Sequence, residues 1–164
     1  MTRRLLAASL ALCLAAVSAH AQDGAGRKMP DRGQKHVEQG TAIPYEEYPP
    51  TSGPHWPVVA KWGVYPEPVP AEVFVHNLEH GGIVLLYHCT SPCPDVVRQL
   101  QEIYPALPKS KHGHVKVVVS PSARIKTRFA LLAWTRLDEF DTLDRERIVR
   151  FVRAWQDKAP EDVP

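Results

Sequence analysis

The sequence predicts one small α/β domain, in which a mixed sheet and its helices follow in the order β-α-β-β-α. Residues 83–87 (IVLLY) form a continuous β-favouring run, as in a central strand that is buried on both faces. Residues 96–107 and 148–155 each carry apolar side chains at helical spacing. The first of these helices is expected to begin at residues 91–94, because proline is tolerated in a first turn. It should join two parallel strands through a right-handed crossover.

The other elements complete the sheet and its cover. Further strands are expected at residues 115–119 (VKVVV) and 129–137 (FALLAWTRL). Because the connection at residues 120–126 is short, the later strand should run antiparallel. Asp141 or Thr142 is expected to cap the N-terminus of the last helix.

The start of the chain has the features of an export signal. Two arginines precede an apolar run over residues 5–17, and Ala19-His20-Ala21 has small residues where a signal peptidase cuts. Residues 1–21 are therefore expected to be a signal peptide, with the protein periplasmic or secreted. No second run of about 18 apolar residues follows, so no membrane span is expected after cleavage.

The remaining chain divides into a leader and one domain. Residues 22–35 are polar and lack periodicity, and they are expected to be a flexible leader to a single α/β domain at residues 36–160. Prolines concentrate in residues 44–70, where they exclude a long helix. The same stretch holds aromatic side chains that would not be left in water: Tyr45, Tyr48, Trp56, Trp62 and Tyr65. It is therefore expected to wrap, as an irregular segment, against the domain core.

The charge balance excludes a partner that binds through a basic surface. The chain has 20 basic and 18 acidic side chains, and loss of Arg3 and Arg4 with the signal peptide leaves 18 of each. Nucleic-acid binding depends on counterions that a basic face releases from phosphates. No nucleic-acid partner is expected.

Residues 75–82 (VHNLEHGG) hold the strongest local signal for chemistry. His76 and His80 are four residues apart, so on a helix they would share a face and one metal ion, with Glu79 beside them as a base or an orienting group. Along a strand the same spacing covers roughly 13 Å and no ion could be shared. Residues 73–75 (VFV) look strand-like and glycines follow the motif, so a short helical turn between extended pieces is expected.

Residues 49–55 (PPTSGPH) place a third histidine behind a rigid turn. His55 follows Gly53-Pro54, so its backbone is fixed before any partner arrives. If His55 folds back towards His76 and His80, three imidazoles with an open fourth position would suit copper or zinc. The alternative is a stiff loop whose histidine is exposed, with His76 and His80 hydrogen-bonded in a turn. The sequence does not decide the role of His36.

These two motifs, with residues 63–65 (GVY) and the apolar strand after Gly82, resemble the signature of a family of secreted or membrane-tethered bacterial proteins. The family is known only as a domain of unknown function, and the likeness runs from about Tyr45 to Trp155. It brings no established reaction. The resemblance implies that four residues belong to one site: His55, His76, Glu79 and His80.

Residues 89–94 (CTSPCP) are similar to the copper-delivery proteins of cytochrome oxidase assembly. That resemblance implies a thioredoxin-like fold and copper binding by two thiolates, here Cys89 and Cys93, with a distant histidine. The sequence ahead of the pair shows neither the strand nor the helix that this fold requires. Independently, a helix N-terminus would stabilise a thiolate at Cys93 and favour a soft metal or thiol exchange. The alternative is a structural disulfide, which an oxidising compartment permits.

Together these observations predict an exported metal-binding protein that acts as a carrier or sensor. Copper is expected rather than zinc, with His55, His76 and His80 as ligands and Cys89 with Cys93 as a redox pair or a disulfide. The expected partners are the metal ion and a periplasmic protein. Two alternatives stay open: a small metal-dependent or acid–base enzyme that uses Glu79, and an interaction module that docks through its proline-rich front.

Overall fold

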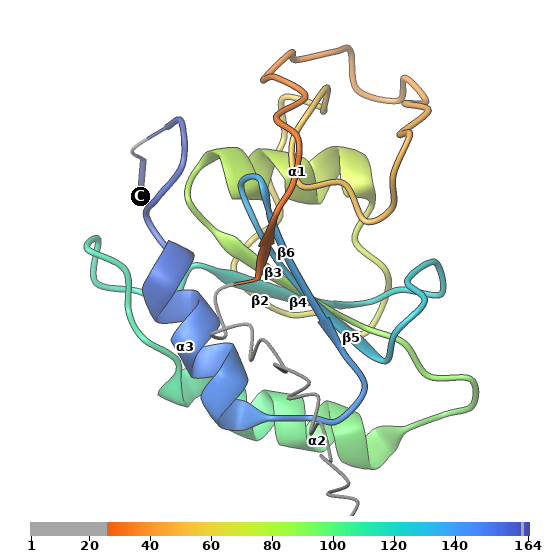
Figure 1. Cartoon of the computed structure of the whole chain (residues 1–164), viewed down its shortest axis with the longest axis vertical. Coiled ribbons are helices and arrows are strands. Elements are labelled where there is room, and N and C mark those ends of the chain that lie inside the picture. Colours follow the sequence, from red (N-terminus) through yellow and green to blue (C-terminus); the bar gives the residue numbers. More distant parts are fainter. Residues whose placement is uncertain (1–25, 162) are drawn as a thin grey trace, which may run out of the picture.

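The computed structural model describes residues 26–161 and 163–164 (Figure 1). The expected signal peptide and residues 22–25 lie outside these residues. The rest of the expected flexible leader is part of the sheet: strand β1 (Arg27–Lys28) pairs antiparallel with strand β6 (Arg136–Phe140) at one edge. The domain contacts therefore begin before residue 36.

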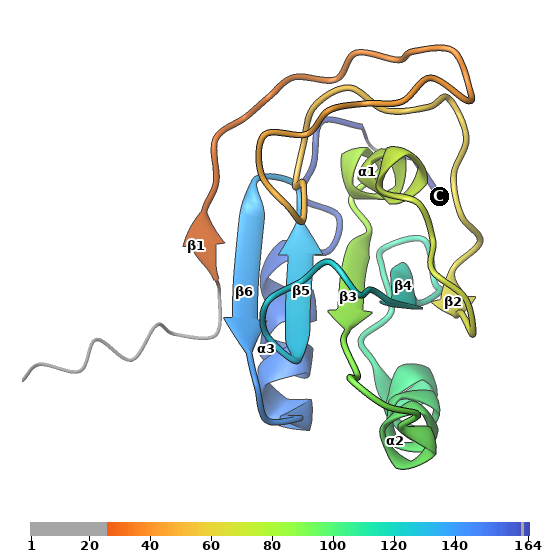
Figure 2. The ribbon, with the colours of Figure 1, turned by 90° about the vertical axis from the view of Figure 1, so that its right-hand side faces the viewer.

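The sheet has six strands in the order β1-β6-β5-β3-β4-β2, which Figure 2 shows side by side. Strand β3 (Ile83–Tyr87) is central, as its composition predicts. It pairs parallel with β4 (Val117–Pro121) on one side and antiparallel with β5 (Phe129–Ala133) on the other. The short strand β2 (Gly63–Val64) adds to β4 in parallel. The predicted mixed α/β fold is confirmed.

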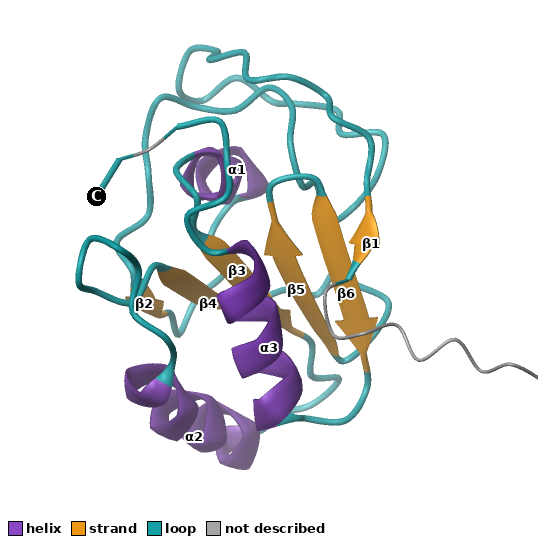
Figure 3. Ribbon diagram, turned by 60° about the vertical axis from the view of Figure 1, so that its left-hand side comes forward, coloured by secondary structure: helices purple, strands orange, loops and turns teal. Residues whose placement is uncertain are grey.

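Helices cover both faces of this sheet (Figure 3). Helix α1 (Ala71–Glu79) packs on the face that carries Val84 and Leu86. Helices α2 (Pro94–Ile103) and α3 (Arg145–Trp155) pack on the opposite face, and a short 3-10 turn follows α2. Alternate side chains of β3 thus feed two separate cores, as expected for a strand that is buried on both sides.

The prediction of one strand over residues 129–137 is wrong. The run folds into a hairpin of β5 and β6, and Thr135 takes a left-handed φ of 56° at its turn. Contacts from distant segments hold this turn, since the Thr135 amide donates to the Thr51 carbonyl at 3.0 Å and its carbonyl accepts from the Met29 amide at 2.9 Å. The sequence contains no glycine or asparagine there, so the usual turn signal is missing.

The last helix begins later than expected. Asp144, rather than Asp141 or Thr142, is the N-cap of α3, and its Oδ1 accepts from the Arg147 amide at 3.0 Å. Asp141 instead accepts a hydrogen bond from the Arg128 amide at 2.9 Å. Both carboxylates accept a hydrogen bond from a backbone amide, but only the amide that Asp144 contacts belongs to the first turn of the helix.

Residues 73–75, which look strand-like, belong to helix α1. The helix presents Phe74, Val75 and Leu78 to the core at helical spacing. It ends at Glu79, and Gly81 follows with a φ of 76°; the Gly81 amide donates to the Leu78 carbonyl and the Gly82 amide to the Asn77 carbonyl. This is the glycine-terminated helix end of the Schellman type.

Strand β2 and helix α1 also correct the view that a strand and a helix are missing ahead of the cysteine pair. After β1, the chain forms β2, α1 and β3, then α2 leads to β4, and the antiparallel β5–β6 hairpin and α3 follow.

Residues 36–70, here called the arm, cross over α1, as the aromatic side chains predict. Tyr45, Tyr48, Trp62 and Tyr65 pack against the core on that face. The Asn77 side chain of α1 pairs with both backbone groups of Ala60, at 2.9 and 2.8 Å. In Figure 1 the arm, drawn in orange to yellow, runs above the helix. The arm and α1 therefore form one packed unit, and the candidate site lies between them.

Candidate metal centre

The end of helix α1 carries three candidate metal ligands, two in its last turn and one at its C-cap. His76, Glu79 and His80 are spaced three and four residues apart, so they share one face of the helix. Glu79 is 2% exposed, and the His76 and His80 rings have centroids 4.5 Å apart. Helical geometry therefore brings the His76 and His80 rings together, as the four-residue spacing predicts for a helix.

The arm supplies two more histidines through backbone pairing. His36 and His55 form a parallel bridge, in which the His55 amide donates to the Lys35 carbonyl at 3.0 Å and the Val37 amide to the His55 carbonyl at 2.9 Å. The Trp56 amide then donates to the Glu72 carbonyl at 2.8 Å, which ties this pair to α1. His55 is fully buried, and the rigid turn before it fixes the position of its backbone.

Three imidazoles converge on a single carboxylate oxygen. Glu79 Oε2 lies 2.9 Å from His55 Nε2, 3.4 Å from His36 Nε2 and 3.8 Å from His76 Nε2. The three ring centroids are 4.7 to 4.9 Å apart. All four ligand atoms lie within 4.8 Å of one another, so one metal ion could contact them all.

The outer nitrogen of two rings is already occupied. His55 Nδ1 lies 2.8 Å from the Gly53 carbonyl and His76 Nδ1 lies 3.0 Å from the Trp56 carbonyl. A carbonyl oxygen only accepts, so each Nδ1 carries a hydrogen and a neutral ring has its lone pair on Nε2. The His55 lone pair lies 2.9 Å from Glu79 Oε2, a contact between two acceptors that becomes favourable with a proton or a metal ion between them. Metal-bound histidines characteristically donate their other N–H to such carbonyls.

The electrostatics keep one of these rings neutral. Burial lowers the pKa of His76 below its usual 6.5, and the positive charges that His80, His55 and His36 would carry lower it further, against the opposite effect of Glu79. Burial, together with the positive charges of Lys116 and His55, lowers the pKa of His80 against the opposite effect of Glu161 and Glu79. Neutral imidazoles are the form in which histidine binds metals.

The expected trio is therefore distributed over two adjacent groups. His55 and His76 join His36 and Glu79, whereas His80 forms a second group with Glu79 and Glu161. His80 Nε2 lies 3.1 Å from Glu161 Oε2, in the C-terminal tail. His36 and Glu161 have no motif around them, so the sequence did not identify either; only their backbone pairing with distant segments brings them here.

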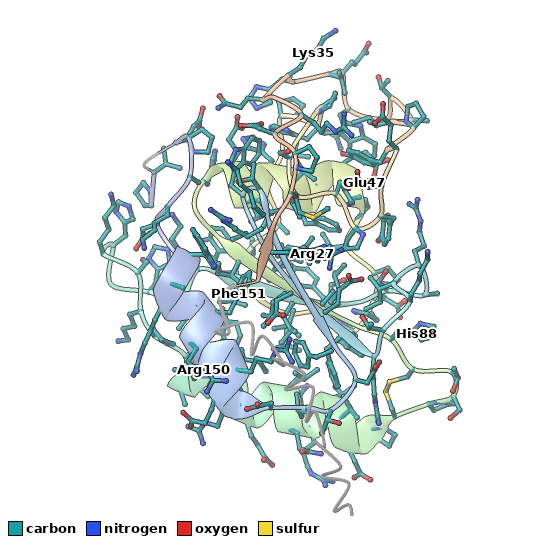
Figure 4. The ribbon with its side chains drawn as sticks, in the orientation of Figure 1. Arg27, Lys35, Glu47, His88, Arg150 and Phe151 are labelled. Atoms are coloured by element: carbon teal, nitrogen blue, oxygen red, sulfur yellow. A yellow bond between two sulfur atoms is a disulfide. The ribbon has the colours of Figure 1, made fainter. Side chains whose placement is uncertain are left out.

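Cys89 and Cys93 form a disulfide between the end of β3 and the start of α2. In Figure 4 it appears as a yellow bond below His88, at the far end of the molecule from Lys35, which directly precedes the arm. Neither candidate metal-binding group among the described residues includes a cysteine. The two cysteines are thus paired with each other in this structure, and the copper site that the cysteine motif implies stays a prediction. The disulfide is consistent with a secreted protein.

Within residues 26–161 and 163–164, no helix has the length and apolar character needed to cross a membrane. No curated protein and no solved structure matches the chain significantly. Residues 36–164 match the family model described as "Protein of unknown function (DUF3105)", and this range contains both candidate groups. The match covers well over half of the chain, so this protein belongs to the DUF3105 family.

Proposed function

We propose that this is an exported metal-binding protein that carries or senses one divalent transition-metal ion. The observation that supports it is the convergence of three Nε2 atoms on one buried carboxylate oxygen, at 2.9 to 3.8 Å. With metal–ligand bonds of about 2.0–2.1 Å, neighbouring ligand atoms lie about 2.9 Å apart in square-planar and about 3.3 Å apart in tetrahedral geometry, which fits these distances. The proposed ligands are His36, His55, His76 and Glu79.

The donor set supports copper(II) first and zinc second. Imidazole nitrogen and carboxylate oxygen suit both ions, and no sulfur ligand is within reach because the cysteines are paired elsewhere. At a given nitrogen and oxygen site, Cu²⁺ binds more tightly than Zn²⁺ in the general order of divalent metals. We propose copper(II) as the preferred ion on this ground.

Two features support a carrier or sensor over the alternatives. His36 has 45% of its side chain exposed, so one side of the site is open to exchange of the ion. An apolar cavity of about 330 Å³ lies between the arm and the segment before it, where Met29 and Tyr45 line it, and none of the four proposed ligands lines it. An enzyme would need its substrate cavity beside the metal.

The surface also gives little support to an interaction module. Among the described residues Val59, at 47%, is the exposed large apolar side chain. Four aromatic residues of the arm, Tyr45, Tyr48, Trp62 and Tyr65, pack against the core. They therefore do not form an exposed apolar patch, which is the usual mark of a docking surface.

Export is part of the proposal, supported by the disulfide and by the N-terminal sequence. Cell fractionation followed by N-terminal sequencing tests it. The expected result is a periplasmic or secreted protein that begins at Gln22. A protein that keeps residues 1–21 in the cytoplasmic fraction would contradict it.

Metal binding is tested by titrating the metal-free protein with Cu²⁺ against a chelator of known affinity. Glu79→Gln keeps the shape of the side chain and removes its charge, and it should lower the affinity at least about 100-fold, since loss of an outer-shell partner alone costs about 10- to 100-fold. Glu146→Gln, at an exposed position in α3, is the matched control and should bind as the wild type does. Equal affinity in all three proteins would contradict the proposed site.

A further inference from the structure

The end of helix α1 and the C-terminal tail form a second set of metal-binding groups. Ligand atoms of Glu79, His80 and Glu161 lie within 4.8 Å of one another, and His80 Nε2 is 3.1 Å from Glu161 Oε2. One imidazole and two carboxylates are ligands that zinc and copper(II) both accept. We infer that the site takes two metal ions, the second bound by Glu79, His80 and Glu161, with the Glu79 carboxylate shared between the two positions. This inference rests on the proposed function and extends it.

Glu79 belongs to both groups, which makes them neighbours rather than separate sites. Its Oε2 faces the imidazoles of the first group, and its side chain is almost fully buried between the arm and the tail. The His76 and His80 rings, one from each group, have centroids 4.5 Å apart. In two-metal centres the ions lie about 3.5–4 Å apart, a separation that one carboxylate can span.

The tail is held in place by backbone hydrogen bonds to the end of α1. The Glu161 amide donates to the Glu79 carbonyl at 3.1 Å, and the Asp157 amide donates to the Gly81 carbonyl at 2.9 Å. These two bonds fix the tail beside the helix end before any ion arrives. Glu161 is thereby positioned by the fold, even though 43% of its side chain is exposed.

Lys116 is the nearby group that opposes a cation at this position. Its positive charge acts on His80, lowering the pKa of that ring. However, its Nζ donates to the backbone carbonyls of His80 and Val163 and lies 3.5 Å from Asp157 Oδ1. The Asp157 carboxylate offsets the lysine charge, and the two carboxylates of the second group face the ion. With three ligands and a partly exposed carboxylate, the second ion should bind more weakly than the first.

The number of ions bound per chain tests this inference, with Cu²⁺ as the probe. The metal-free full chain is titrated, dialysed at a fixed free Cu²⁺ concentration and analysed for copper. The wild type should bind two ions, while Glu161→Gln and His80→Ala should each bind one under the same conditions. Glu102→Gln, whose side chain is 69% exposed on α2, should bind two and serves as the control.

Electron paramagnetic resonance adds a readout that a merely structural role would not change. Two Cu²⁺ ions joined by one carboxylate couple their spins, so the doubly loaded wild type should give less signal than two isolated ions. Glu161→Gln, with one ion, should give the full signal of one. A wild type that binds a single ion, or a Glu161→Gln protein that still binds two, would overturn the second site. A wild type that binds none would contradict the proposed function itself.

Discussion

His55 Nε2 lies 2.9 Å from Glu79 Oε2, while Nδ1 of the same ring donates to the Gly53 carbonyl. Both groups are almost completely buried. A neutral ring so arranged directs its lone pair at a carboxylate in a place that water does not reach, and only a cation between them makes the contact favourable. The proposed metal site depends on this relationship between the two residues.

His36→Ala should weaken Cu²⁺ binding without unfolding the protein. His36 contributes an Nε2 atom 3.4 Å from Glu79 Oε2, but its side chain is 45% exposed, so little apolar contact is lost. Affinity should fall at least about 10-fold, since loss of an outer-shell partner alone costs about 10- to 100-fold. Isothermal titration calorimetry measures the affinity and a thermal melt checks the fold. His114→Ala, in the turn before β4, is the control and should leave the affinity unchanged.

Acidification should destabilise the metal-free protein. The folded-state pKa values of His76 and His80 lie below the unfolded value of 6.5, chiefly because both rings are buried. Between the folded and unfolded pKa values the unfolded chain binds more protons, so the free energy of unfolding falls as the pH drops below about 6.5. Urea unfolding at pH 7.5 and pH 5.5 measures this. If His76→Gln loses as much stability on acidification as the wild type does, His76 is not a source of the effect.

Acid should also release the metal, since protons compete for the same imidazole nitrogens. The affinity for Cu²⁺ should therefore decline as the pH falls through the histidine range, and binding at pH 6 should release protons to the buffer. Calorimetry in two buffers of different ionisation enthalpy measures the protons released. Binding that is independent of pH between 7.5 and 5 would argue against histidine ligands.

Removing the disulfide should cost stability but leave the metal site intact. Cys89→Ser with Cys93→Ser opens a short loop, and loop-closure entropy predicts a loss of about 2 kcal/mol in the free energy of unfolding. The pair lies at the end of β3 away from the arm, so copper stoichiometry should not change. A double variant that no longer binds copper would show that the cysteines act in the metal site after all.

Asp138→Ala should destabilise the fold through an ion pair that is remote from the metal site. Asp138 is 2% exposed and accepts from Arg147 at 2.5 and 2.8 Å. Breaking a fully buried ion pair costs about 3–5 kcal/mol of unfolding free energy. Because the Arg147 side chain is 29% exposed, we expect a smaller loss of about 2–3 kcal/mol. Glu139→Gln removes the exposed pair with Arg27 and should cost less than about 1 kcal/mol. Denaturant unfolding compares the two variants.

The parts of the fold that the sequence predicted are those with a local signal. Strand β3 could be recognised because five consecutive apolar residues have few other uses in a small domain. Helix α1 was harder, since Val73 and Val75 favour strands and only packing against the sheet shows which period applies. The hairpin turn at Thr135 was missed because Thr51 and Met29, both far away in the chain, hold it.

The candidate site was predictable to the same extent. His55, His76, Glu79 and His80 lie in compact motifs, and the structure brings them close together. His36 could not be chosen, because it reaches the site only through a bridge between two irregular segments. Glu161 depends on a tail whose backbone bonds to the end of α1, and no periodicity reports such a contact.

X-ray absorption spectroscopy of the protein loaded with one equivalent of Cu²⁺ counts the ligands directly. The first coordination shell should contain nitrogen and oxygen only, with the multiple-scattering pattern of three imidazoles, and His36→Ala should reduce the imidazole count by one. A shell that contains sulfur, or fewer than two imidazoles in the wild type, would contradict a metal centre built by His36, His55, His76 and Glu79.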